Sequence, residues 1–215
     1  MKIPAHISAS HRTLLVGTAS LVLATPAAHA HHAMGGATPD TLAQGLLSGI
    51  AHPVIGLDHL AFLLVAALLS AMLTGRGRYL VPLAFVVGTV AGTLHHLGAA
   101  DLPMTETVIA LSVLLGGLTV VLRHSLPALL LGGLFGVIGV FHGYAYGESI
   151  VGAESTPLLS YLAGFALIQF AIIVGGVKAL DAVARHSPQL QAGVVRYTGL
   201  AAAATGALFL GMNIA

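Results

Sequence analysis

Residues 52–74 have the sequence HPVIGLDHLAFLLVAALLSAMLT, in which a short polar segment leads into a long apolar run. The run at 57–74 contains no Asp, Glu, Lys or Arg after Asp58. At about 1.5 Å per residue it approaches the roughly 30 Å of a bilayer's hydrocarbon core. Five further stretches follow it, near 79–99, 105–122, 126–146, 157–178 and 194–213. The sequence therefore predicts an all-α polytopic membrane protein with about six transmembrane helices.

The composition agrees with a membrane protein. Of 215 residues, 57% are hydrophobic and 7% are charged, whereas a soluble domain carries about 25% charged residues. The formal net charge is +1 and the basic residues are scattered, which argues against nucleic-acid binding. Cysteine is absent, which excludes disulfides, iron–sulfur clusters and thiolate metal sites. Histidine is abundant, with twelve residues against eight Lys and Arg together.

The N-terminus has the features of a secretory signal. Lys2 and Arg12 precede an apolar stretch at 13–25, and Ala28-His29-Ala30 is an A-x-A cleavage site. That stretch is too short to span a bilayer by itself. We therefore expect a cleaved signal peptide at 1–30 and a single transmembrane domain at 31–215, whose mature N-terminus lies in the periplasm.

The start of the mature chain contains a shorter apolar segment. Residues 42–51, LAQGLLSGIA, are too few to span a bilayer, and Pro53 follows them. Because the residue before a proline is disfavoured in a helix, we expect a short interfacial or re-entrant helix that stops before Pro53.

The distribution of charge gives an orientation that is independent of the signal peptide. With the mature N-terminus outside, all six Lys and Arg of the mature chain fall on the cytoplasmic side: Arg76, Arg78, Arg123, Lys178, Arg185 and Arg196. Every acidic residue except Asp181 falls on the outer side. This asymmetry follows the positive-inside rule and predicts a multi-pass protein of the inner membrane.

Three polar clusters interrupt the apolar stretches. The first is HPVIGLDH at 52–59, where Pro and Gly break the backbone between His52 and the segment with Asp58 and His59. The second is His95-His96, and the third is FHGYAYGE at 141–148. On the predicted topology all three lie in the outer half of the membrane. Ionisable residues are costly there and by default indicate a functional site that faces the interior of the bundle.

The side chains in these clusters suit a transition metal. Imidazole nitrogen with carboxylate oxygen, and no sulfur, favours Ni(II), Co(II) or Zn(II) over Cu(I). A broken helix brings such groups together from adjacent backbone. His95 and His96 point about 100° apart on a helix, so we expect at most one of them to face the site. The predicted metal-contacting residues are His52, Asp58, His59, His142, Glu148 and one of His95 and His96.

These residues resemble the HupE/UreJ family of bacterial membrane proteins. The resemblance covers most of the chain: the signal peptide, the histidines at the mature N-terminus, six spans, the H-P-x-x-G-x-D-H signature at 52–59 and the FHGYAYGE stretch. Many members carry His where this chain has Tyr146. The resemblance implies permeation of nickel or cobalt, with His52, Asp58, His59, His142 and Glu148 as contacts for the ion.

The function expected from this resemblance is a permease, not an enzyme. It admits Ni²⁺ or Co²⁺ from the periplasm through a path lined by His, Asp and Glu, without ATP hydrolysis, because no G-x-x-x-x-G-K-[ST] motif occurs. The ion is the transported substrate, and no permanently bound cofactor is expected. The expected partners are the ion and the lipid bilayer, with a homo-oligomer left open.

Two alternatives remain open from the sequence. In a haem protein, His95 or His96 would face His142 at similar depth and ligate the iron, which a Soret absorbance would reveal. In a metalloenzyme-assembly partner, the chain would move no ion, which a transport assay in a metal-uptake-deficient host would reveal.

The predicted topology is testable with reporter fusions. We expect a reporter fused after Arg78 or Arg185 to be cytoplasmic, and one fused after Asp101 or Ser155 to be periplasmic, because basic residues are retained inside. The enzymatic activity of each reporter, and its accessibility to a labelling reagent, show on which side of the membrane it lies. Opposite results at two of these four sites would contradict the topology.

Overall fold

In the computed structural model, residues 37–99 and 101–214 are described, and the predicted signal peptide lies outside them. These residues form helices and no strands. The elements are α2 (Leu42–Ile55), α3 (Leu57–Ala71), α4 (Gly77–Leu97), α5 (Thr105–Val121), α6 (Ala128–Gly147), the 3₁₀-helix η1 (Glu148–Ile150), α7 (Ser155–His186) and α8 (Pro188–Ile214). The predicted all-α class is confirmed.

Most of these helices are long and apolar enough to cross a membrane. Four pass this criterion: α4, α6 continued through η1, α7 and α8. The pair of α2 and α3 passes only as one bent unit, and the 17-residue α5 is a shorter apolar helix. The structure therefore supports four to five spans by length and composition, fewer than the six predicted.

The region before the first predicted span differs from the prediction in two ways. The helix does not stop before Pro53 but contains it and ends at Ile55, with Gly56 as the break. In addition, α3 has only 15 residues, about 22 Å, and meets α2 at an angle of 77°. α2 packs closely on α7 at Gly45 and Gly49, before the proline, and continues two residues beyond Pro53.

The segment between the predicted stretches 157–178 and 194–213 is also mostly helical. The helix α7 continues to His186 and α8 begins at Pro188, so only Ser187 separates them. The proline explains this arrangement, because its fixed φ suits the first helical position and its missing N–H is not needed there.

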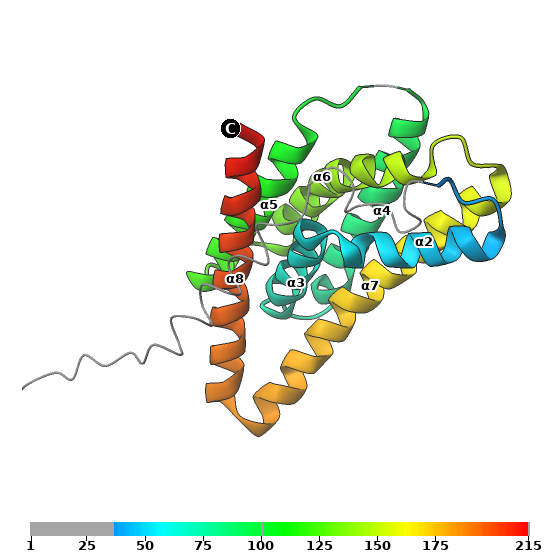
Figure 1. The fold of residues 1–215 in the computed structure, drawn as a ribbon. Coiled ribbons are helices and arrows are strands. Elements are labelled where there is room, and N and C mark those ends of the chain that lie inside the picture. The colour runs from blue at the N-terminus through cyan, green and yellow to red at the C-terminus, as the bar shows by residue number, and fades with distance from the viewer. Residues whose placement is uncertain (1–36, 100, 215) are drawn as a thin grey trace, which may run out of the picture. The chain divides into compact units, whose positions relative to one another are not determined.

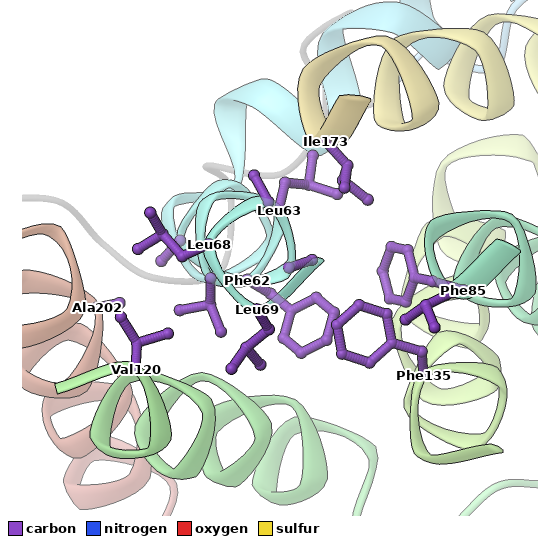
Figure 2. Close-up of a cluster of buried hydrophobic side chains, with 14 of the residues drawn as sticks. Phe62, Leu63, Leu68, Leu69, Phe85, Val120, Phe135, Ile173 and Ala202 are labelled. Carbon is purple, nitrogen blue, oxygen red and sulfur yellow. The ribbon is translucent and has the colours of Figure 1, made fainter. Parts of the chain in front are cut away.

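The helices associate as three pairs around α3. The pairs are α4 with α6, α5 with α8, and α2 with α7, and α3 packs against α2, α4, α5, α7 and α8 (Figure 1). Figure 2 shows this core nearly along α3, whose side chains point outward to its neighbours on several sides. Phe62 of α3 meets Phe85 of α4 and Phe135 of α6, with ring centroids 4.9 and 5.6 Å away.

Small residues set the spacing of the α4–α6 pair. A Cβ added to Gly139 would overlap the carbonyl oxygen of Phe85 and lie 3.1 Å from the Cα of Gly88. A Cβ added to Gly143 would overlap the carbonyl oxygen of Thr89. Helices that associate in lipid often bring their backbones together in this way. The pair positions His142, which lies between these two close approaches along α6.

The α4–α6 contact predicts opposite effects for two glycines of one helix. Gly139→Ala should destabilise the protein by about 1–3 kcal/mol, because its methyl group meets backbone that cannot yield. Gly133→Ala should be neutral or stabilise by up to about 1 kcal/mol, because nothing lies within 4 Å and alanine favours helices. Thermal unfolding of both variants in detergent measures the difference. Equal melting temperatures would contradict the close approach.

Candidate metal-binding site

The break at Gly56 positions the first two histidines. His52 lies in the last turn of α2 and His59 in the first turn of α3, and both are almost fully buried. Their ring centroids are 5.9 Å apart. A Cβ at Gly56 would lie 2.6 Å from Cδ2 of His59, so glycine leaves room for this ring beside the break.

Asp58 lies beside His59 at the N-terminus of α3. Its side chain is 2% exposed, and Oδ1 accepts a hydrogen bond of 2.8 Å from the backbone N–H of His59. A carboxylate at this position satisfies an unpaired helix N–H and offsets the positive end of the helix dipole. Asp58 therefore makes the N-terminus of α3 less repulsive to a cation.

His142 brings the third helix to this group. It lies on α6, is fully buried, and its Nδ1 is 2.9 Å from Nδ1 of His59. Thus His52 and His59 of the first polar cluster and His142 of the third come together inside the bundle. Tyr146 of α6 is also fully buried, with its ring centroid 5.0 Å from that of His52 and 4.6 Å from that of His59.

Two hydroxyl groups that were not predicted from the sequence to lie in the site contact the ring of His52. Ser149 Oγ lies 2.8 Å and the Tyr161 hydroxyl 3.3 Å from Nδ1 of His52. The Tyr161 hydroxyl also donates to the backbone carbonyl of Tyr146, at 2.8 Å. A signal for both was available in the sequence, since each is a polar side chain within or beside an apolar stretch.

Ser112 of α5 determines the direction of the hydrogen bonds. Its hydroxyl donates to the carbonyl of Ile109 at 2.7 Å, so its oxygen accepts from Nε2 of His142, 3.2 Å away. A neutral imidazole carries one N–H, so Nδ1 of His142 accepts and Nδ1 of His59 donates. In this arrangement the Ser112 hydroxyl and the two imidazoles form one hydrogen-bonded chain across α5, α6 and α3.

The remaining predicted contacts lie elsewhere. Glu148 is exposed, His95 is exposed, and His96 is partly buried with its ring 4.4 Å from that of Tyr144. His96 and Glu148 line one hollow of about 470 Å³ together with Asp101. The predicted residues therefore separate into a buried group and a surface group. Neither His95 nor His96 is within the buried group, and which of the two faces the path stays a prediction.

The described residues contain no finished metal cage. No group of three or more His, Asp or Glu side chains among them has the geometry to hold a metal ion. For the haem alternative, Ser112 and His59 lie within hydrogen-bond distance of the two ring nitrogens of His142, His95 is exposed and His96 is partly buried, so this alternative stays a prediction. The buried group is a pair of touching imidazoles with a third nearby and a carboxylate on the same turn.

Comparison with known proteins gives the family of this arrangement. Residues 19–209 match the family described as HupE / UreJ protein. The chain belongs to the HupE/UreJ family. It is 30% identical over 196 residues to Protein HupE of Rhizobium leguminosarum bv. viciae, covering 91% of this chain and 96% of that protein. No solved structure matches. The family predicted from the H-P-x-x-G-x-D-H and FHGYAYGE motifs is confirmed.

The role of Ser112 can be tested without a transport assay. Ser112→Ala should mix the tautomers of His59 and His142, because Nε2 of His142 loses its acceptor, whereas Ser112→Thr should preserve them. Nitrogen-15 NMR of histidine-labelled protein in detergent reports which ring nitrogen carries hydrogen.

Ser160→Ala is the matched control, because the Ser160 hydroxyl bonds the Pro157 carbonyl on α7. Its spectrum should match that of the unmodified chain. Unchanged histidine signals in Ser112→Ala would contradict the hydrogen-bond directions.

Proposed function

We propose that this chain is a permease for Ni²⁺ or Co²⁺, which moves the ion from the periplasm to the cytoplasm without ATP hydrolysis. The observation that carries the proposal is the meeting of His52, His59 and His142 inside an apolar bundle. Burial of three imidazoles and the Asp58 carboxylate is costly in a membrane protein, and such groups mark ion pathways. Membership of the HupE/UreJ family, usually associated with nickel or cobalt transport, supports the same function.

The spacing of the nitrogen atoms supports a divalent transition metal. Two ligands at about 2.1 Å from one ion and at right angles to each other are about 3 Å apart. The Nδ1 atoms of His59 and His142 are separated by 2.9 Å. An ion held by both takes the place of the hydrogen that they share. Imidazole suits nickel and cobalt, and the chain has no cysteine to select softer metals.

An incomplete ligand set favours transport over storage. Conduction requires binding that is strong enough to admit the ion and weak enough to release it. Two or three imidazoles leave several coordination positions to water, whereas a closed cage would retain the ion. The hollow lined by Glu148, His96 and Asp101 lies near one end of the helices. Its two carboxylates carry negative charge, which raises the local concentration of cations.

The orientation of the proposed path rests on charge. The basic residues lie at the ends of helices that the positive-inside rule assigns to the cytoplasm, and Glu148 and Asp101 lie at the opposite ends. With this orientation the buried histidines lie nearer the periplasmic side. The ion would then meet the hollow lined by Glu148 and Asp101 first and the buried histidines second.

The proposal predicts which substitutions abolish uptake. His52→Ala, Asp58→Ala and His59→Ala should each lower the initial rate of radiolabelled Ni²⁺ or Co²⁺ uptake into proteoliposomes by about tenfold or more, because each removes a ligand or its support. His186→Ala is the control, because His186 is exposed and, within the described part of the chain, its hydrogen bond is to the Ala182 carbonyl of its own helix.

Protein levels and melting temperatures accompany each rate. Equal uptake by all four variants would contradict the site. Absence of uptake by the unmodified chain would favour a role in metalloenzyme assembly.

A further inference from the structure

One face of α7 is buried along most of its length. Tyr161, Phe165, Gln169, Ile173 and Val177 follow one another at intervals of four residues, and each is 0% exposed. Side chains at this interval lie above one another on a helix. Gln169 is thus an amide in the middle of this buried stripe, with two aromatic residues before it and two aliphatic residues after it.

The amide of Gln169 has no hydrogen-bond partner among the described residues. Both Oε1 and Nε2 are buried and unbonded. Inside a membrane bundle such a residue usually bonds a neighbouring helix. Buried polar groups are nearly always paired, and an orphan in a native protein indicates a functional role, a water or an ion. A leucine of similar size would fill the same space without leaving two polar atoms unpaired.

The position of Gln169 relates it to the histidines. Tyr161 bonds His52, and the ring of Phe165 lies 5.5 Å from that of Tyr146, which packs on His59. Gln169 follows Phe165 by one helical turn, about 6 Å, in the direction of Lys178. It precedes Ile173, which belongs to the same core cluster as Leu63 of α3 (Figure 2). Gln169 is therefore the first polar side chain beyond the histidines on this stripe.

A second orphaned group lies farther in the same direction. Ser70 of α3 is 0% exposed, and its Oγ has no partner among the described residues. Ala67, three residues before Ser70 on α3, packs against Gly176 of α7. Gly176 lies more than one turn beyond Gln169. Unbonded polar side chains thus occur on both α7 and α3 beyond the histidines, among residues that are mostly apolar.

We propose that Gln169 forms a second binding site for the transported cation, between the histidines and the basic ends of the helices. This inference rests on the proposed function. Oε1 would bind the partly hydrated divalent ion, and Nε2 would donate to a water that the ion carries. A neutral amide oxygen is a weaker ligand for nickel or cobalt than imidazole, so the ion would pass from stronger to weaker ligands as it leaves.

The test separates a ligand from a tolerated core residue. Gln169→Leu should lower the maximal uptake rate of Ni²⁺ in proteoliposomes about tenfold or more while KM changes less than about twofold, because capture at the histidines is intact. Its melting temperature should rise, because two orphaned atoms are removed. Gln169→Glu, which keeps an oxygen at the same position, should transport faster than Gln169→Leu. Ile173→Leu on the same stripe should change neither the rate nor KM.

The outcomes distinguish this inference from the function on which it rests. Uptake at the unmodified rate by Gln169→Leu would overturn the inference and leave the permease intact. If Gln169→Leu does not fold, Gln169→Met supplies the unbranched apolar replacement, and full uptake by that variant is equally decisive. No uptake by the unmodified chain, or undiminished uptake by His52→Ala, would instead overturn the proposed function.

Discussion

A helix inside a membrane can be interrupted only where protein covers the backbone groups that the interruption opens. The break at Gly56 meets this constraint because α2 is held against α7 and α3 lies among the other helices. The 77° bend places the last turn of one helix and the first turn of the next at the same point. His52 and His59 then face a common interior, and α6 supplies His142 there.

Much of this arrangement was predictable from composition and local pattern. Long apolar stretches give helices because hydrocarbon leaves no other way to satisfy the backbone. A proline and a glycine between two histidines predicted a break with imidazoles on both sides, and the structure has it at Gly56. The exact end of α2 was predicted wrongly: a proline disfavours helical backbone for the residue before it, yet here the helix continues through Pro53 to Ile55.

What could not be predicted is the direction in which each polar side chain points. Apolar residues surround every membrane helix on all sides, so the sequence period says little about which face of α5 turns Ser112 toward His142. For the same reason Glu148 and His96 could not be separated from the buried histidines, and the hydrogen bond expected of Gln169 could not be excluded. These positions depend on the angles between helices, which only the packed bundle determines.

The length of α7 has a mechanical consequence. Near one end Tyr161 bonds His52, and twenty residues later Asp181 forms an ion pair of 2.7 Å with Arg78 of α4. These two attachments are about 30 Å apart, the thickness of the hydrocarbon core. The proline of this helix, Pro157, lies in the first turn, before both attachments. Because one continuous helix carries both attachments, the hydrogen bond to His52 and the ion pair with Arg78 fix its two ends to α2 and α4.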